Sequence, residues 1–207
     1  RSELMRAAHA GSDLVKQLMD FLDHGSGERR STDLGRFIDH QRSLLQQLVG
    51  DQFELTVTQQ SFDALACQCD QHQLLQVLTN LVLNARDTYP ARGGSIEISV
   101  DREHIDESVC HLVMGAYAGE FVRIRVVDRG TGMTPDVLAH AGDPLFTTKT
   151  VSRTNGLGLP IVYAIVRAHD GFMSIESRPD RGTTVSVLMP QAAGAAPEPR
   201  TDASAPA

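Results

Sequence analysis

Three polar side chains share one face of a predicted helix near the middle of the chain. Asn80, Asn84 and Asp87 stand at positions i, i+4 and i+7 of the segment 71–88, so they form one stripe. Beside this stripe runs an apolar face made of Leu74, Val77, Leu78, Leu81 and Ala85. Asparagine is a poor helix former, and a merely solvated stripe would more naturally be lysine and glutamate. The pattern therefore favours a polar site held against the core.

Two glycine pairs follow at places where the backbone could approach a ligand. Gly130 and Gly132 come directly after Asp128, at the end of a predicted strand, and permit a tight turn against a flat ligand. The second pair lies in NGLGLP (155–160) and opens a predicted helix whose free N–H groups could hold phosphate oxygens. Each pair alone also fits an ordinary turn or helix start.

The elements that must position these residues alternate along the chain. Helices are predicted at 33–49, where Asp33 is the cap, at 71–88, where Asp70 and Gln73 resemble a capping box, at 135–141 and at 158–169. Strands are predicted at 53–58, 64–67, 95–100, 120–128, 172–177 and 183–189, with an ill-defined segment over 101–119. Helices beside a mostly antiparallel or mixed sheet predict the α+β class, as a two-layer α/β sandwich.

Composition excludes several classes of function. The 207 residues carry a formal net charge of −7, which argues against generalised binding to nucleic acid, so any polyanion must be held locally. Every apolar stretch is shorter than the roughly 18 residues of a membrane span, and the first residues have no signal-peptide layout. We therefore expect a cytoplasmic segment that makes no membrane contact.

The cysteines suggest no disulfide framework, because there are only three. Cys67 and Cys69 with His72 could begin a metal site, but no second pair follows at zinc-ligand spacing. Buried strand cysteines are the favoured interpretation.

The two ends of the chain differ from its middle. Residues 2–24 show a heptad-like apolar pattern typical of a helix bundle, and the alternative is an amphipathic helix lying on its own domain. A Gly/Ser/charge linker follows, and the tail QAAGAAPEPRTDASAPA is expected to be disordered. The predicted organisation is a bundle helix (1–24), a linker (25–33), a main domain (34–190) and a tail (191–207).

The order of the motifs resembles the catalytic domain of sensor histidine kinases, within the gyrase, Hsp90, histidine kinase and MutL superfamily. QVLTNLVLNARD (76–87) resembles the asparagine box of that family, DRGTGM (128–133) its first glycine box, PLFTTK (144–149) its phenylalanine box, GLGL (156–159) its second glycine box and RGTT (181–184) its last. The resemblance covers about 34–190 and implies the Bergerat-type ATP-binding fold. Residues 1–24 then resemble the second helix of the dimerisation hairpin.

The resemblance implies roles for the matched residues. Asn84 would coordinate a Mg²⁺ ion that bridges the ATP phosphates, and Asn80 would help to orient ligands or water. Asp128 would accept a hydrogen bond from the adenine amino group. Gly130 and Gly132 would let the backbone lie against the base.

The other matched residues would complete the same pocket. Asp87 and Thr183 would support it through polar contacts or a water, and Met133 ends the first glycine box. Phosphate contacts would come from backbone N–H groups of the second glycine box and from nearby polar or basic side chains. These candidates are Gly156, Leu157, Gly158, Thr148, Lys149, Arg86 and Arg153.

The sequence also departs from the family pattern. Thr154 stands where the family usually has a glycine in its lid, and Gly142 and Leu145 replace common aromatics. The phosphorylated histidine of this family precedes an acidic residue on the first hairpin helix, whereas His9 precedes Ala10. His169 with Asp170 ends a predicted helix of the main domain and is a poor candidate. We expect the phosphoacceptor histidine to lie outside this chain.

The expected function is the catalytic region of a two-component kinase. It would bind Mg-ATP and transfer the γ-phosphoryl group to a hairpin histidine, for relay to a response-regulator receiver domain, and the full-length protein would be a homodimer. One alternative is an ATP-driven machine, but such relatives have a glutamate where this chain has Asn80, and an amide cannot take a proton. The other alternative is a degenerate adaptor that docks a response regulator without catalysis.

Overall fold

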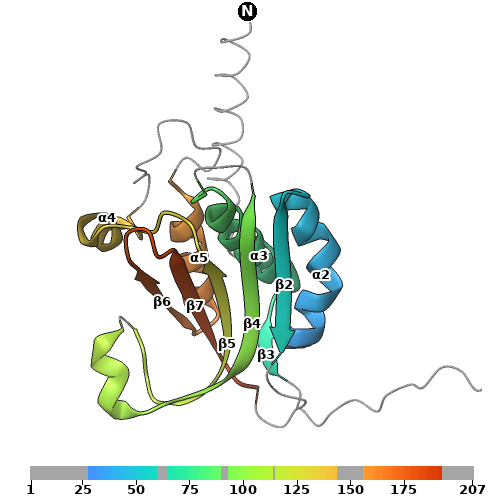
Figure 1. Ribbon diagram of the computed structural model, residues 1–207. Helices are drawn as coiled ribbons and strands as arrows, with labels where there is room; N and C mark the ends of the chain where they lie inside the picture. Colours follow the sequence, from blue (N-terminus) through green and yellow to red (C-terminus); the bar gives the residue numbers. More distant parts are fainter. Residues whose placement is uncertain (1–27, 60–64, 90–92, 114, 144–155, 193–207) are drawn as a thin grey trace, which may run out of the picture.

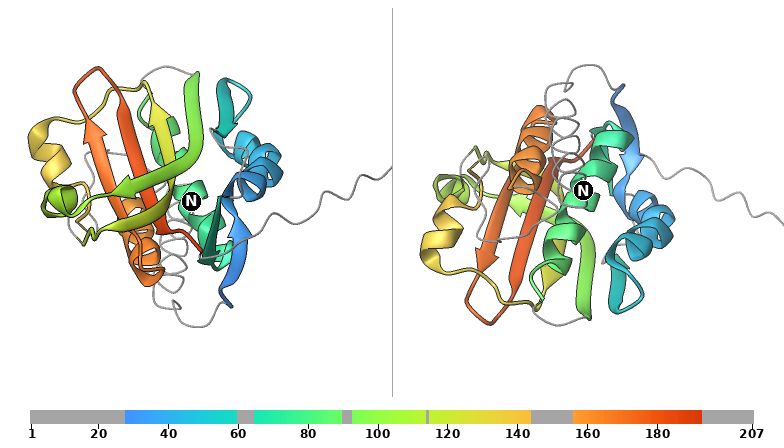
Figure 2. Two further views of the ribbon diagram at one scale, coloured as in Figure 1. Left: turned by 90° about the horizontal axis from the view of Figure 1, so that it is seen from below. Right: turned by 90° about the horizontal axis from the view of Figure 1, so that it is seen from above.

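The computed structural model describes residues 28–59, 65–89, 93–113, 115–143 and 156–192 (Figure 1). The predicted bundle helix, residues 144–155 and the tail beyond residue 192 lie outside the described residues. One five-stranded sheet forms a layer, and the helices α2, α3 and α5 form the second layer behind it (Figures 1 and 2). This is the expected α+β two-layer sandwich.

The sheet is mixed and has the strand order β2-β4-β5-β7-β6. Its strands are β2 (Phe53–Gln59), β4 (Gly94–Ile105), β5 (Gly119–Asp128), β6 (Phe172–Ser177) and β7 (Thr183–Pro190). Strand β2 runs parallel to β4, and the other pairs are antiparallel. The register aligns Asp128, the last residue of β5, with Thr183, the first residue of β7. Two residues predicted for the pocket therefore meet at one end of the sheet.

The helices begin where their caps predict. Asp33 accepts a hydrogen bond from Arg36 N at the start of α2 (Leu34–Val49), and Asp70 accepts one from His72 N at the start of α3 (Gln71–Arg86). The other helices are α4 (Pro135–His140), α5 (Gly158–Ala168) and the 3-10 helix η1 (Glu107–Leu112). None of the described helices is long and apolar enough to cross a bilayer.

The core lies between the helices and the sheet. Helix α3 contributes its apolar face, including Leu78 and Leu81, and helix α5 contributes Ile161 and Val162, all of them buried. Because side chains alternate along a strand, β5 sends Val122, Ile124 and Val126 into this core. Packing of α3 against the sheet thus fixes the polar stripe that begins with Asn80.

Three boundaries differ from the prediction. Residues 30–33, assigned to the linker, form β1 (Arg30–Asp33), which pairs antiparallel with β3 (Ala66–Cys69). That second strand lies two residues beyond its predicted position. At the other end, Gln191 bridges Cys67 and Ala192 N donates to Ala66 O, so the first two residues of the predicted tail are held on β3.

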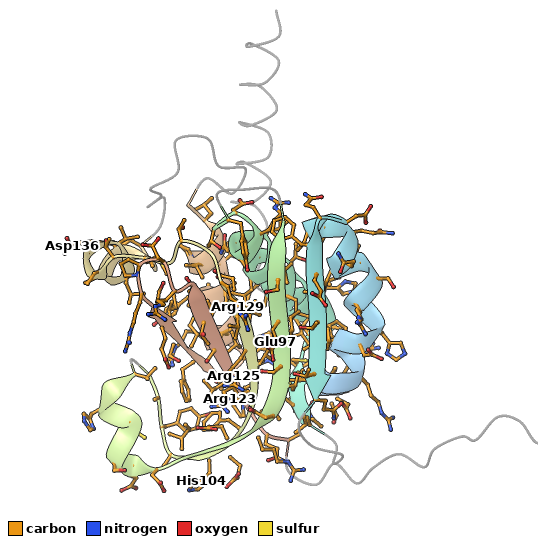
Figure 3. The ribbon with its side chains drawn as sticks, viewed as in Figure 1. Glu97, His104, Arg123, Arg125, Arg129 and Asp136 are labelled. Carbon is orange, nitrogen blue, oxygen red and sulfur yellow. The ribbon has the colours of Figure 1, made fainter. Side chains whose placement is uncertain are left out.

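Strand β4 is also longer than predicted. The segment 101–105 was expected to be ill-defined, but it continues the strand and pairs with residues 119–123 of β5. Asp101 is 6% exposed, and its carboxylate receives two hydrogen bonds of 2.8 Å from Arg123. Asp101 and Glu103 of this segment both pair with Arg123 on the face of the sheet away from the helices, where Arg123 and Arg125 lie side by side (Figure 3). Their ion pairs replace the apolar alternation that identifies a strand in sequence.

The turn that ends α5 joins three parts of the fold. His169 is 4% exposed, and its Nε2 accepts a hydrogen bond of 3.1 Å from Asp70 N at the start of α3. Tyr117, from the connection between β4 and β5, donates to Asp170 O at 2.9 Å. Arg29 donates to Asp170 Oδ2 at 3.0 Å and to Ala168 O. The predicted His169–Asp170 pair is therefore a structural turn, with the imidazole buried.

Candidate functional site

A cavity of about 470 Å³ opens between α3, α4, α5 and the adjoining ends of β5 and β7. Its wall combines apolar side chains with a few polar groups, which is typical of a pocket for a small organic ligand. The apolar part includes Leu81, Ala85, Val126, Met133, Val137, Ala141, Leu159, Pro160 and Val185. The polar part includes Asn84, Asp87, Thr88, Asp128, Thr131, Thr134 and Thr183.

Asp128 supplies a buried carboxylate to this wall, since the residue is only 5% exposed. Its Oδ1 accepts hydrogen bonds from Gly130 N at 2.8 Å and from Thr88 Oγ1 at 2.9 Å. These two donors stabilise the negative charge and fix the orientation of the group. A carboxylate held in this way can accept a hydrogen bond from an amino group of a ligand.

The first glycine pair allows the loop after Asp128 to pass close to its neighbours. Gly132 has φ +63°, in the left-handed region, and a β-carbon there would overlap the carbonyl oxygen of Arg178. A β-carbon on Gly130 would overlap the hydroxyl group of Thr88. Beyond the loop, Met133 N donates to Ser177 Oγ at 2.8 Å, and Ser177 Oγ lies 2.9 Å from Thr183 Oγ1. The loop is therefore fixed against both β6 and β7.

Asn84 also lines the cavity, beside the N-terminus of α5. A β-carbon built on Gly158 would lie 3.0 Å from Asn84 Nδ2, so the glycine lets the helix approach without displacing this side chain. No side chain caps α5, because its N-cap residue is Leu157. Pro160 has no N–H group, so the N–H groups of Gly158 and Leu159 are the donors of this first turn. An amide oxygen and a positive helix end thus lie together.

The structure brings most of the predicted site residues together. Asn84, Asp87, Asp128, Gly132, Met133, Gly156, Gly158 and Thr183 all line the cavity. Gly130 is buried against Thr88, and Leu157 is buried in the core behind the start of α5.

The other predicted residues are placed differently. Asn80 lies one turn from Asn84 on α3 and is absent from the cavity wall. Arg86 is also absent from it, because its guanidinium donates to Asp87 Oδ1 and to Leu48 O, at 2.7 to 3.0 Å. Thr148, Lys149, Arg153 and Thr154 lie outside the described residues.

Thr88 and Tyr89 are site residues that the sequence interpretation missed. Thr88 O accepts hydrogen bonds of 3.1 Å from both Thr131 N and Thr131 Oγ1, while Tyr89 OH accepts one of 2.9 Å from Arg129 N. Thr88 and Tyr89, just after α3, therefore hold the loop that follows β5 through hydrogen bonds to residues 129 and 131. The only sequence signal is spacing, because position 88 continues the stripe of Asn80 and Asn84 by another four residues.

The cysteines of β3 are structural. Cys67 is 1% exposed and Cys69 is fully buried, and the described residues contain no group of three or more His, Cys, Asp or Glu side chains placed to hold a metal ion. A hydrogen bond with the Cys69 thiol, together with burial, raises the pKa of the Cys67 thiol. The interpretation as buried strand cysteines is confirmed.

Comparison with known proteins identifies the family. The model of the histidine kinase-, DNA gyrase B- and HSP90-like ATPases matches residues 69–193, more than half of the chain. The chain belongs to this family. Within it, the named relatives and the structural likeness support a histidine kinase ATP-binding domain.

Two curated relatives illustrate the similarity. Sensor kinase CckA of Brucella abortus is 33% identical over 184 residues, which cover 89% of this chain and 19% of that protein. Sensory histidine kinase/phosphatase NtrB of Rhizobium leguminosarum is 32% identical over 201 residues, which cover 92% of this chain and 49% of that protein. The chain thus spans half or less of the length of these two relatives.

Solved structures show the same fold. Full-length ShkA in complex with AMPPNP superposes with a TM-score of 0.69 at 22% identity, covering 94% of this chain and 39% of that one. The catalytic domain of the histidine kinase ThkA superposes with a TM-score of 0.58 at 23% identity, covering 79% of this chain and 96% of that domain. Most of this chain therefore shares the fold of that isolated domain.

Proposed function

We propose that the cavity binds Mg-ATP, with adenine at the Asp128 end and the phosphates at the Asn84 end. The observation that carries this proposal is the presence of two unlike polar groups, the Asp128 carboxylate and the Asn84 amide, in the wall of one largely apolar cavity. A buried carboxylate suits the amino group of adenine, and apolar walls formed by Met133 and Val137 suit its ring. The uncapped start of α5 suits phosphate oxygens.

The residues present also fit a magnesium ion. Mg²⁺ prefers oxygen ligands and usually takes only one or two from the protein, the rest coming from phosphates and water. The amide oxygen of Asn84, in the cavity wall beside the first turn of α5, would be such a ligand. The ion would neutralise charge on the phosphates, while Asn84 and the N–H groups of Gly158 and Leu159 orient them.

The bound nucleotide would be a phosphoryl donor to a histidine on a dimerisation hairpin, and a response-regulator receiver would accept the group next. Transfer rather than hydrolysis is supported by the described part of the cavity wall, which holds no Glu or His to activate water. Its two carboxylates are already engaged, Asp87 by Arg86 and Asp128 by Thr88 and Gly130. Asn80, one turn away on α3, is an amide and cannot serve as a base. Positioning and charge stabilisation would supply most of the catalysis. The cytoplasm, where ATP is available, is the proposed location.

Calorimetric titration with ATP, with and without Mg²⁺, tests the binding step. The wild-type chain should bind ATP more tightly with the metal, and Asn84→Ala should lose most of that metal-dependent gain. Asp128→Asn should lose the preference for ATP over GTP, because an amide can donate as well as accept a hydrogen bond. Unchanged binding in both variants would remove the site assignment, and absence of nucleotide binding in the wild type would favour the adaptor.

Phosphoryl transfer is tested by supplying a phosphoacceptor hairpin in cis and following radiolabel from the γ-position of ATP. Acid-labile, base-stable label on the hairpin histidine is expected, together with little release of inorganic phosphate. Turnover of ATP at the rate of a dedicated ATPase would instead point to an ATP-driven machine.

A further inference from the structure

Thr88 occupies the junction between the polar helix and the base end of the cavity. It lies two residues beyond the end of α3, and it also lines the cavity. Its backbone is fixed by a hydrogen bond from Thr88 N to Ala85 O at 3.1 Å and by the two bonds that Thr131 gives to Thr88 O. The side chain therefore has a defined position relative to Asp128.

The Thr88 hydroxyl has one proton and two acceptors within reach. Its Oγ1 lies 2.7 Å from Ala85 O and 2.9 Å from Asp128 Oδ1. A hydrogen bond to an ionised carboxylate is about twice as strong as one between neutral groups, so the negative charge of Asp128 attracts this proton. Because Gly130 N donates to the same oxygen at 2.8 Å, two protein donors are directed at Oδ1.

The Thr88 hydroxyl fits its position because residue 130 is a glycine. A β-carbon on Gly130 would overlap the Thr88 hydroxyl, so the glycine leaves the space that the hydroxyl fills. Thr88, Asp128 and Gly130 thus form one hydrogen-bonded unit that joins the end of α3 to the end of β5. The carboxylate cannot rotate without breaking both bonds to Oδ1.

We propose that Thr88 is a positioning residue for base recognition, whose hydroxyl orients the Asp128 carboxylate toward the 6-amino group of a purine. The proposal rests on the proposed function of the cavity. Removal of the hydroxyl leaves Asp128 with Gly130 N as its remaining donor in this unit, and the carboxylate then turns more freely. The loss of affinity affects ligands that carry the 6-amino group, because only these ligands depend on the orientation of the carboxylate.

Paired nucleotides test this role. We compare binding of ATP with binding of purine riboside triphosphate, which lacks only the 6-amino group, by titration calorimetry of the same chain. Thr88→Val keeps the shape of the side chain and removes the hydroxyl, while Thr88→Ser keeps the hydroxyl. Thr56→Val, on the edge strand β2 and outside the cavity wall, is a matched control.

The expected result is a change in the ratio of the two affinities. Thr88→Val should reduce the preference for ATP over the analogue by up to about tenfold, because the contact between Asp128 and the 6-amino group is weakened but not removed. Thr88→Ser and Thr56→Val should keep the wild-type ratio. Thr88→Ala is the second hydroxyl-free variant, and it is tested in place of valine if Thr88→Val does not fold.

Two outcomes would overturn the role of Thr88. An unchanged ratio in a folded hydroxyl-free variant would show that Asp128 is oriented without the hydroxyl. Equal loss of both nucleotides would show that Thr88 only supports the fold of the loop. In both cases the wild type still binds ATP, so neither outcome is confused with failure of the proposed function, in which the wild type binds no nucleotide.

Discussion

Gly158 lies directly against the side-chain amide of Asn84. A β-carbon at position 158 would lie 3.0 Å from Asn84 Nδ2 and 3.1 Å from Asn84 Oδ1, closer than ordinary packing allows. The contact joins the first residue of α5 to the last turns of α3. The amide that we assign to the metal and the helix end that we assign to the phosphates are therefore in close contact.

Gly158→Ala should displace this amide by a few tenths of an ångström and weaken Mg-ATP binding. We expect a loss of about tenfold in affinity with Mg²⁺, and a much smaller loss for adenosine, which has no phosphates. Titration of Gly158→Ala, Asn84→Ala and the double variant forms a thermodynamic cycle. The two losses should be strongly non-additive, because both act through one amide. Additive losses would contradict the coupling.

Gly132→Ala should destabilise the loop after β5. The residue has φ +63°, and a β-carbon there would overlap the carbonyl oxygen of Arg178, so the backbone itself must move. We expect a loss of at least about 2 kcal/mol in the free energy of unfolding, measured by urea denaturation. Gly142→Ala is the control, since a β-carbon there meets nothing within 4 Å. Equal stability of the two variants would show that the loop is not constrained at Gly132.

His169 should make the fold less stable in mild acid. Burial lowers the pKa of this imidazole, the charge of Arg29 adds to the decrease, and the Ile165 carbonyl, Asp70 and Asp170 oppose it. Because the folded pKa lies below the unfolded value of 6.5, the unfolded chain takes up the proton first. The contribution to stability is present above about pH 6.5 and is lost as the pH falls through the folded pKa. A protonated Nε2 could not accept the hydrogen bond from Asp70 N.

Urea denaturation at about pH 7.5 and about pH 5.5 measures this effect against His169→Gln, which does not titrate. The variant should show the smaller loss of stability in acid. The comparison is needed because Glu120 raises the pKa of the exposed His104, which changes stability in the opposite direction. Identical pH dependence in both proteins would show that His169 is not the titrating group.

Arg123→Met should destabilise the fold without changing nucleotide affinity. It would leave the buried Asp101 carboxylate without its two hydrogen bonds of 2.8 Å, on the face of the sheet opposite the helices. We expect a loss of about 2–3 kcal/mol in the free energy of unfolding. Arg125→Met is the control: its guanidinium is 3.8 Å from Asp101, so its removal should cost under about 1 kcal/mol. A change in ATP affinity for Arg123→Met would show that this face communicates with the cavity.

The sequence predicted well those elements whose ends are marked by nearby residues. Helices α2 and α3 were placed by Asp33 and Asp70, whose side chains do accept the expected capping bonds. The strands with apolar alternation, such as β5, were also placed well. The elements that were predicted wrongly are those that depend on pairing with residues distant in sequence. Strand β1 has the composition of a linker, and the end of β4 pairs with β5 although it is highly charged, with Asp101 neutralised by Arg123.

The candidate site was likewise predicted where the signal is local and missed where it depends on distant residues. Helical spacing predicted Asn84 as a site residue, and Asn84 does line the cavity. The two glycine pairs predicted the places where the backbone comes close to it. The bond between Thr88 and Asp128 spans 40 positions of sequence, so no local pattern could indicate it. Arg86 looked like a phosphate ligand by its charge, but the carbonyl of Leu48 and the carboxylate of Asp87 engage its guanidinium.

Strand β3 contacts the residues near both ends of the described fold. Arg30 pairs with Cys69 on one side of it, and Ala192 N bonds to Ala66 O at its other end. Strand spacing and rise put residues 30 and 192 roughly 14 Å apart. A linker of a few residues could therefore close the described fold into a ring, and new ends could be opened at an exposed turn outside the cavity wall, such as that around Asp51. Such a circular permutant would keep every strand pairing of the sheet. The described fold, with the proposed nucleotide site, could also be inserted into a loop of another protein, because its two ends lie close together.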